Sequence, residues 1–323
     1  MAVEVKVPTV QIDKNESAPR QDKMDKYVLF RKLLRRLPYN FGSSLFSLSL
    51  QNPLARKVLK RIIGPLRRLT RELGMTPISP LQFDRFIQTN YLSNWRLHGL
   101  TVCNKHFFNK FVEFKNLDYF EQYYGQRGII LNNSHTGGGK LVVPLISRLG
   151  YNLSSLDRVD SYTHISEPGR GAIESILLGT RKDKKFHLKE MFKCQKRLAK
   201  KGVLHIVSDG YRGNSGYETS FLGRRRTFRR SFAELAVSSN AVVIPVRSRV
   251  EPCGKVLVEF LSPIDPGKLP ETDESKIQGL CESYARMLEQ DWQIYPDCVF
   301  KNDIKLFFEL ESSAAQSASR GSE

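Results

Sequence analysis

The chain has 323 residues, of which 40% are hydrophobic and 26% charged, and these proportions exclude a disordered or fibrous protein. Its 51 Lys and Arg residues against 33 Asp and Glu residues give a formal charge of +18, which would attract nucleic acid, an anionic lipid surface or an acidic carrier protein. Five cysteines without C-x-x-C spacing indicate a reducing compartment and argue against a disulfide framework or a zinc site.

The two ends of the chain are predicted to be disordered tails, over residues 1–23 and 311–323, because they are polar or rich in Ser, Ala and Gly. Residues 24–90 are predicted to be a basic amphipathic helical segment. Within it, apolar residues recur at helical spacing over 24–37, and the stretch 55–73 repeats this basic chemistry. Such helices either lie on an anionic membrane or pack on their own domain. No run reaches the ~18 apolar residues that a membrane span requires.

From residue 128 onward, strand patterns alternate with helix patterns. Short apolar runs predict strands over 128–133, 203–207, 241–246 and 255–261. Helical periodicity predicts helices over 137–149, 188–201, 228–239 and 275–292. The sequence therefore predicts an α/β domain over 91–310, with a mixed central sheet flanked by helices and functional loops at the strand ends.

The most distinctive candidate site begins at His135, which follows a predicted strand and precedes Gly137, Gly138 and Gly139. The first turn of a helix presents unpaired N–H groups and partial positive charge, which together stabilise an anion. Glycines let the backbone approach a ligand closely. A histidine beside such a site could deprotonate a hydroxyl while the amides hold an oxyanion. The six histidines show no metal-ligand spacing, so no metal is expected.

Four motifs occur in an order that resembles the lysophospholipid acyltransferase superfamily, specifically its lauroyl/myristoyl lipid A acyltransferase branch. They are Asn132-Asn-Ser-His135 with the following glycines, Gly202-Val-Leu-His-Ile-Val-Ser-Asp209, Phe221-Leu-Gly-Arg224 and Asn240-Ala-Val-Val-Ile-Pro-Val246. The resemblance extends over residues 91–308 and implies a glycerolipid-acyltransferase-like fold. It also implies transfer of a fatty acyl chain from an acyl carrier protein or coenzyme A thioester to a hydroxyl of a lipid, glycolipid or sugar-type acceptor.

On this resemblance, His135 is the general base and the amides of Gly137 to Gly139 stabilise the oxyanion. Arg224 binds the phosphate of the acceptor or of the donor's phosphopantetheine, and Asp209 organises the loop that follows it or only caps that loop. The acyl thioester is a co-substrate and no other cofactor is expected. The +18 charge and the basic helices favour a cytoplasmic protein, peripheral on the inner face of the cytoplasmic membrane.

One position departs from the family motif H-x4-D/E, because Lys140 stands where the carboxylate is expected. A cation there would lower the pKa of the histidine rather than orient it. Another carboxylate such as Asp160 or Asp209 could replace the missing one. Alternatively, Lys140 binds a phosphate or a developing oxyanion, or the protein is a catalytically inactive relative that binds lipid. A second alternative is a basic nucleic-acid-binding protein, suggested by the arginines at 224–226 and 229–230, although no RNA-binding aromatic signature accompanies them.

Overall fold

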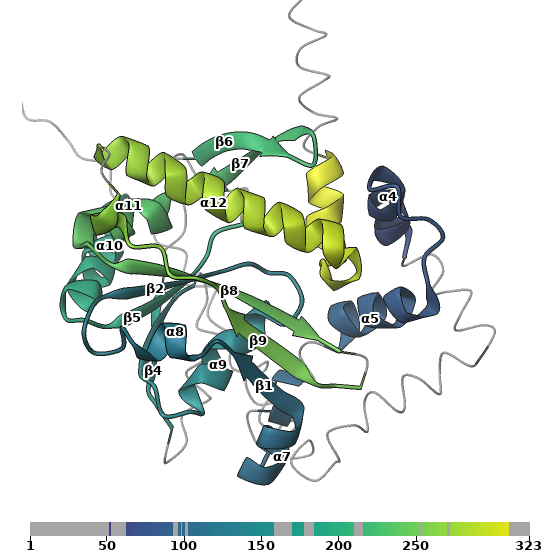
Figure 1. Cartoon of the computed structure of the whole chain (residues 1–323), viewed down its shortest axis with the longest axis horizontal. Helices are drawn as coiled ribbons and strands as arrows, with labels where there is room; N and C mark the ends of the chain where they lie inside the picture. Colours follow the sequence, from purple (N-terminus) through teal and green to yellow (C-terminus); the bar gives the residue numbers. More distant parts are fainter. Residues whose placement is uncertain are drawn as a thin grey trace, which may run out of the picture.

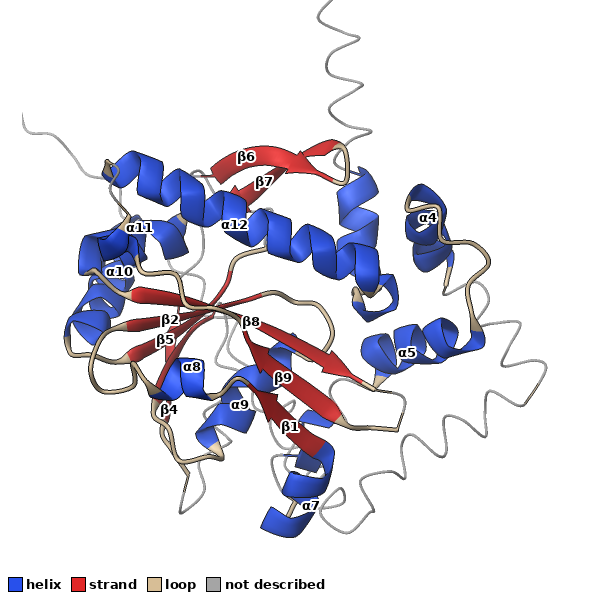
Figure 2. Cartoon of the chain, in the orientation of Figure 1, coloured by secondary structure: helices blue, strands red, loops and turns tan. Residues whose placement is uncertain are grey.

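A seven-stranded sheet forms the centre of the fold (Figures 1 and 2). The candidate site lies at the carboxyl ends of two of its inner strands. The computed structural model describes residues 52, 63–92, 96–97, 99–100, 103–157, 170–177, 184–209, 216–251, 253–269 and 272–309. The sheet order is β1-β9-β8-β2-β5-β3-β4. Its strands are β1 (Val112–Lys115), β2 (Ile129–Asn133), β3 (Leu153–Asp157), β4 (Ile173–Leu177), β5 (Val203–Val207), β8 (Val242–Val250) and β9 (Val256–Phe260). Only the β8–β9 pair is antiparallel, so the sheet is mixed, as predicted.

The central strands are buried on both faces because helices cover the sheet on both sides. Successive side chains of β2 point to opposite faces, so Ile130 packs in one core while Ile129 and Leu131 pack in the other. This double burial explains why the strand appears in the sequence as a continuous apolar run. The helices are α4 (Gly64–Glu72), α5 (Pro80–Tyr91), α7 (Lys105–Phe111), α8 (Asp118–Glu121), α9 (Val142–Ser147), α10 (Lys184–Ala199), α11 (Ser231–Ser239), α12 (Asp273–Ile294) and a last helix over 301–309; short 3-10 turns are η1 (Gly139–Leu141), η3 (Pro266–Lys268) and η4 (Pro296–Cys298).

A two-stranded hairpin outside the main sheet lies where part of a helix was expected. It consists of β6 (Gly216–Phe221) and β7 (Arg224–Arg229), which pair antiparallel. Leu222 and Gly223 at its tip both have positive φ, the backbone of a tight hairpin turn. The helix predicted over 228–239 therefore begins only at Ser231. Phe228 instead lies in β7 and contributes a buried ring to the core.

Helices α4 and α5 share the hydrophobic core of the α/β domain. Leu66 and Leu69 of α4 are fully buried, as are Phe86 and Ile87 of α5, in the same apolar cluster as Trp292 of α12. The boundary predicted at residue 91 thus does not separate two packed units. Since the apolar face of α4 packs inward, this helix does not present that face to a membrane.

Several expectations fall on residues outside the described part of the chain. These are the two tails over 1–23 and 311–323, the basic helix over 24–37 and the carboxylate Asp160. Within the described ranges, no helix combines the length and the apolar composition that crossing a membrane requires.

Candidate active site

His135 and Asp209 meet at the carboxyl edge of two adjacent parallel strands. The register of β2 and β5 pairs Asn133 with Val207, and each site residue lies two positions beyond its strand. The Nδ1 atom of His135 is 2.7 Å from Oδ1 of Asp209, and the backbone N–H of His135 donates to Oδ2 at 2.8 Å. Both carboxylate oxygens therefore hold the same residue, which fixes the ring and its loop together.

The electrostatics of this pair favour a protonated or readily protonated imidazole. Burial lowers the pKa of His135, but the charge and hydrogen bond of Asp209 outweigh burial and leave that pKa above its ordinary value. Burial raises the pKa of Asp209, yet the His135 charge, two hydrogen bonds from His135 and the nearby Arg226 bring it below its usual range. Because the ionised carboxylate only accepts, Nδ1 carries the proton and Nε2 keeps its lone pair.

The two members of the pair differ sharply in exposure. The side chain of Asp209 is 4% exposed, whereas that of His135 is 46% exposed. The carboxylate is thus held inside the fold while the imidazole faces the outside. A basic ring nitrogen backed by a buried carboxylate can accept a proton from a hydroxyl that approaches from solvent.

The three glycines do not act as predicted, because their amides are already hydrogen-bonded within the protein. The N–H of Gly137 donates to the carbonyl of Cys298 at 2.6 Å, that of Gly138 to Ser248 at 3.2 Å, and that of Gly139 to Thr136 at 3.0 Å. In this structure none of these three N–H groups is free to donate to an oxyanion. The oxyanion-binding role predicted for Gly137 to Gly139 therefore does not agree with this structure. The turn also replaces the start of the helix predicted over 137–149, which is reduced to η1 and α9.

Close packing explains the glycines instead. Gly137 has a φ of 57°, and a Cβ there would collide with the carbonyl oxygen of Ser248. A Cβ on Gly139 would collide with the carbonyl oxygen of Ser134. The glycines therefore let the loop that carries His135 fold tightly beneath β8.

A buried polar network supports this loop from below. The Asn133 amide donates to the carbonyl of Gly139 at 3.0 Å and lies 3.4 Å from His205, whose other ring nitrogen is 3.1 Å from the hydroxyl of Ser155. The hydroxyl of Tyr284 donates to the carbonyl of Asn133 at 2.9 Å. Complete burial, with a contribution from His135, lowers the pKa of His205 to about 3. His205 is thus a neutral structural histidine.

Asp209 supplies the carboxylate beside the His135 imidazole, which the motif H-x4-D/E would place at residue 140. Lys140 is exposed, and its Nζ atom lies 5.8 Å from the centre of the Phe300 ring. Its charge acts to lower the pKa of His135. The sequence left open whether another carboxylate replaces the one missing at residue 140, and the position of Asp209 agrees with that explanation. Lys140 adds a positive charge that acts on the imidazole.

The structure adds Asp303, which sequence reasoning missed. It belongs to the helix over 301–309 and interacts electrostatically with His135, Asp209 and Lys140. Burial and the Asp209 charge raise its pKa to about 6. No local pattern marks this residue, because only the tertiary packing of the last helix brings it to the site.

Of the arginine cluster, Arg226 rather than Arg224 contacts the histidine–aspartate pair. Arg226 is 3% exposed and donates to the backbone carbonyl of Asp209 at 3.1 Å. Arg224 forms an ion pair of 2.5 Å with Glu72 and lies over the Phe308 ring at 5.3 Å. Arg224 and Arg226 are thus bound into the fold, whereas the side chain of Arg225 is 88% exposed and pairs with Glu218 at 3.2 Å. The nucleic-acid alternative stays a prediction.

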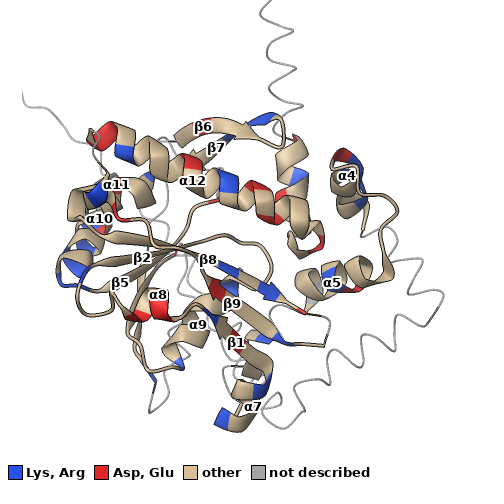
Figure 3. Cartoon of the chain, viewed as in Figure 1, with Lys and Arg blue, Asp and Glu red and all other residues tan. Residues whose placement is uncertain are grey.

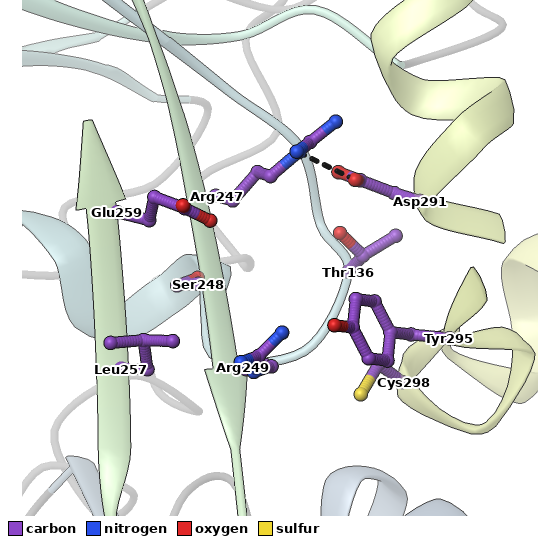
Figure 4. Close-up of a pocket in the computed structure, with 9 residues that line it drawn as sticks. All are labelled: Thr136, Arg247, Ser248, Arg249, Leu257, Glu259, Asp291, Tyr295 and Cys298. Carbon is purple, nitrogen blue, oxygen red and sulfur yellow. Dashed lines mark ion pairs between the residues drawn. The ribbon is translucent and has the colours of Figure 1, made fainter. Parts of the chain in front are cut away.

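A small pocket adjoins the histidine loop at Thr136 (Figure 4). Its residues come from β8, β9, the end of α12, η4 and the loop itself: Thr136, Arg247, Ser248, Arg249, Leu257, Glu259, Asp291, Tyr295 and Cys298. Arg247 and Asp291 form an ion pair of 2.6 Å across it. Two arginines and two acidic residues share its wall with Leu257, Tyr295 and Cys298. Among the described residues, no cluster of His, Cys, Asp and Glu is arranged to hold a metal ion.

Comparisons with known proteins do not identify the function of this chain. No family model matches the sequence, and no curated protein does. Among solved structures, the chain is similar to the 1-acyl-sn-glycerophosphate acyltransferase PlsC from Thermotoga maritima, with 14% identity and a TM-score of 0.36 over 70% of this chain and 96% of that chain. A likeness at this identity and score does not assign the chain to a family.

Proposed function

We propose that the protein is an acyltransferase that moves a fatty acyl chain from an acyl carrier protein or coenzyme A thioester to a hydroxyl of a lipid or sugar-type acceptor. The observation that carries the proposal is the pairing of a half-exposed His135 with a buried Asp209 at the carboxyl edge of β2 and β5. Ligand sites of open α/β sheets lie at this edge. The order of the sequence motifs supports the choice of reaction.

In the proposed reaction, Nε2 of His135 takes the proton of the acceptor hydroxyl as its oxygen attacks the thioester carbonyl carbon. The tetrahedral intermediate then breaks its carbon–sulfur bond, and the thiolate leaves with the proton from the imidazolium. Asp209 keeps Nδ1 protonated and stabilises the imidazolium charge, in the manner of the carboxylate of a catalytic triad. The products are an ester and a free thiol, so atoms and charges balance without a cofactor.

Lys140 is the residue we propose for the developing negative charge, because the glycine amides are engaged elsewhere. It is exposed, and its charge is felt by both His135 and Asp303. An ammonium group there could hold the oxyanion or a phosphate on the acceptor. We further propose that the reaction occurs at the inner face of the cytoplasmic membrane.

The test measures release of free thiol and formation of acylated product with acyl carrier protein thioesters, coenzyme A thioesters and a bacterial lipid extract. We expect turnover that His135→Ala removes. His106→Ala is the matched control, since His106 is exposed on α7 and belongs to no part of the site. Full activity in the His135 variant would remove the histidine from the mechanism. Lipid binding without turnover of any thioester would make the chain an inactive lipid-binding relative.

A further inference from the structure

Helix α10 carries two large apolar side chains on its solvent face. Leu188 is 62% exposed and Phe192 is 68% exposed, the highest values among the large hydrophobic residues of the described chain. They are four positions apart, so they lie side by side on one face of the helix. Exposed apolar pairs of this kind cost the protein solubility unless a partner covers them.

The helical positions show that this face is opposite the core. Glu190, Cys194 and Leu198 are buried and turn toward the sheet, where α10 packs on β4 and β5. At 100° per residue, Leu188 and Phe192 project from the other side of the helix. Their exposure is thus a property of the helix orientation, not of a frayed end.

Lysines line the same exposed face. Lys189, Lys193, Lys196 and Lys200 are all exposed, and Lys193 pairs with Glu190 at 2.8 Å. Figure 3 shows the concentration of basic residues on this helix. An apolar strip flanked by cations is the arrangement by which a helix lies in the headgroup region of an anionic bilayer.

The strip is also oriented toward the candidate site. Helix α10 ends at Ala199, β5 spans Val203–Val207, and Asp209 lies two positions beyond the strand. Since the helix leads directly into the strand and packs along it, its first half lies toward the edge of the sheet that holds Asp209 and His135. A bilayer in contact with Leu188 and Phe192 would therefore be near the edge at which an acceptor must enter.

We propose that the exposed face of α10 docks the protein on an anionic lipid surface, with Leu188 and Phe192 inserted among the headgroups and the lysines facing lipid phosphates. This inference does not depend on the proposed acyl transfer, because membrane binding is measured without turnover. It differs from the expectation for the basic N-terminal segment, since α10 lies in the folded domain itself.

The experiment is cosedimentation of the full chain with vesicles of phosphatidylcholine alone and of phosphatidylcholine mixed equally with phosphatidylglycerol. We expect binding only to the anionic vesicles, and a loss of about tenfold or more in the double variant Leu188→Ser and Phe192→Ser. Lys189→Glu with Lys196→Glu should lower binding by at least about fivefold for each lysine. Leu81→Ser with Ile294→Ser is the matched control, because these residues are 54% and 57% exposed on α5 and α12.

A direct readout replaces Phe192 by Trp. Insertion predicts a blue shift of the tryptophan emission on adding anionic vesicles, beyond any change in the unmodified chain. Equal vesicle binding by the unmodified chain and the serine double variant would overturn the proposal. Vesicle binding that stays intact while the same variant loses binding to acyl carrier protein would also overturn it, and would assign the helix to the carrier instead.

Discussion

Replacing Asp209 by Asn tests the role of the carboxylate most directly. Asparagine has nearly the same shape, and its side-chain oxygen can still accept the backbone N–H of His135, which is 2.8 Å from the carboxylate in the present structure. That bond leaves the NH2 group facing Nδ1, where a carboxylate oxygen now lies at 2.7 Å. An NH2 group donates, so Nδ1 must accept and Nε2 must carry the proton. The ring is then held in the tautomer that cannot act as a base.

The expected loss in kcat is between about 10 and 10⁴. The lower limit follows from a hydrogen bond to a charged group, about 1.5–3 kcal/mol, which corresponds to a factor of roughly 10 to 150. The upper limit is the effect of the same change on the carboxylate of serine protease triads, about 10⁴ in kcat. Asp273→Asn on α12 is the control, because that side chain is 81% exposed.

Two measurements on the Asp209→Asn variant together test the role of the carboxylate. Initial rates of thiol release give kcat, and an NMR titration of the His135 ring gives its pKa. We expect the pKa of His135 to fall in the Asp209→Asn variant, since burial and Lys140 still lower it while its main opposing charge is gone. A general base must be neutral, so the wild-type rate should rise with pH as the raised pKa of His135 is passed. A variant with unchanged rate and unchanged pKa would refute the mechanism.

The remaining predictions concern the loop and the two charges near it. Gly137→Ala should lower the free energy of unfolding by about 1–2 kcal/mol because of the left-handed backbone alone. The loss should be larger still because the new Cβ meets a backbone carbonyl of β8. The control Gly64→Ala has open space around its Cβ and should leave the thermal melt unchanged. Asp303→Asn removes a charge that raises the pKa of His135, so the midpoint of the pH–rate profile should move to lower pH, and any inflection near pH 6 from Asp303 itself should vanish. Lys140→Glu should raise the pKa of His135 and lower kcat at neutral pH, whereas a faster enzyme would show that Lys140 holds no developing negative charge.

The strands with uniform apolar runs could be predicted from the sequence, and the polar or short ones could not. β2 and β5 appear as predicted because both faces are buried. β3 was missed because its centre is Ser154 and Ser155, which are buried only through hydrogen bonds to Glu174 and His205. β1 has four residues at the sheet edge and little apolar signal.

The candidate site was partly visible in the sequence. His135 and Asp209 each stand two positions past a recognisable strand, and parallel neighbours place such residues together. That β2 and β5 are neighbours in the sheet is decided by the tertiary fold and cannot be derived from the local sequence. The same holds for the hydrogen bonds that occupy the glycine amides, since their acceptors at Cys298 and Ser248 are far along the chain.

The link between Gly137 and Cys298 has a consequence for how the protein is made. The loop that bears the imidazole is closed by the carbonyl of Cys298, which lies far along the chain from Gly137, and Asp303 follows a few residues later. During translation, domains assemble as their segments emerge. A nascent chain on the ribosome thus holds its histidine in an incomplete setting until the segment that carries Cys298 and Asp303 has emerged.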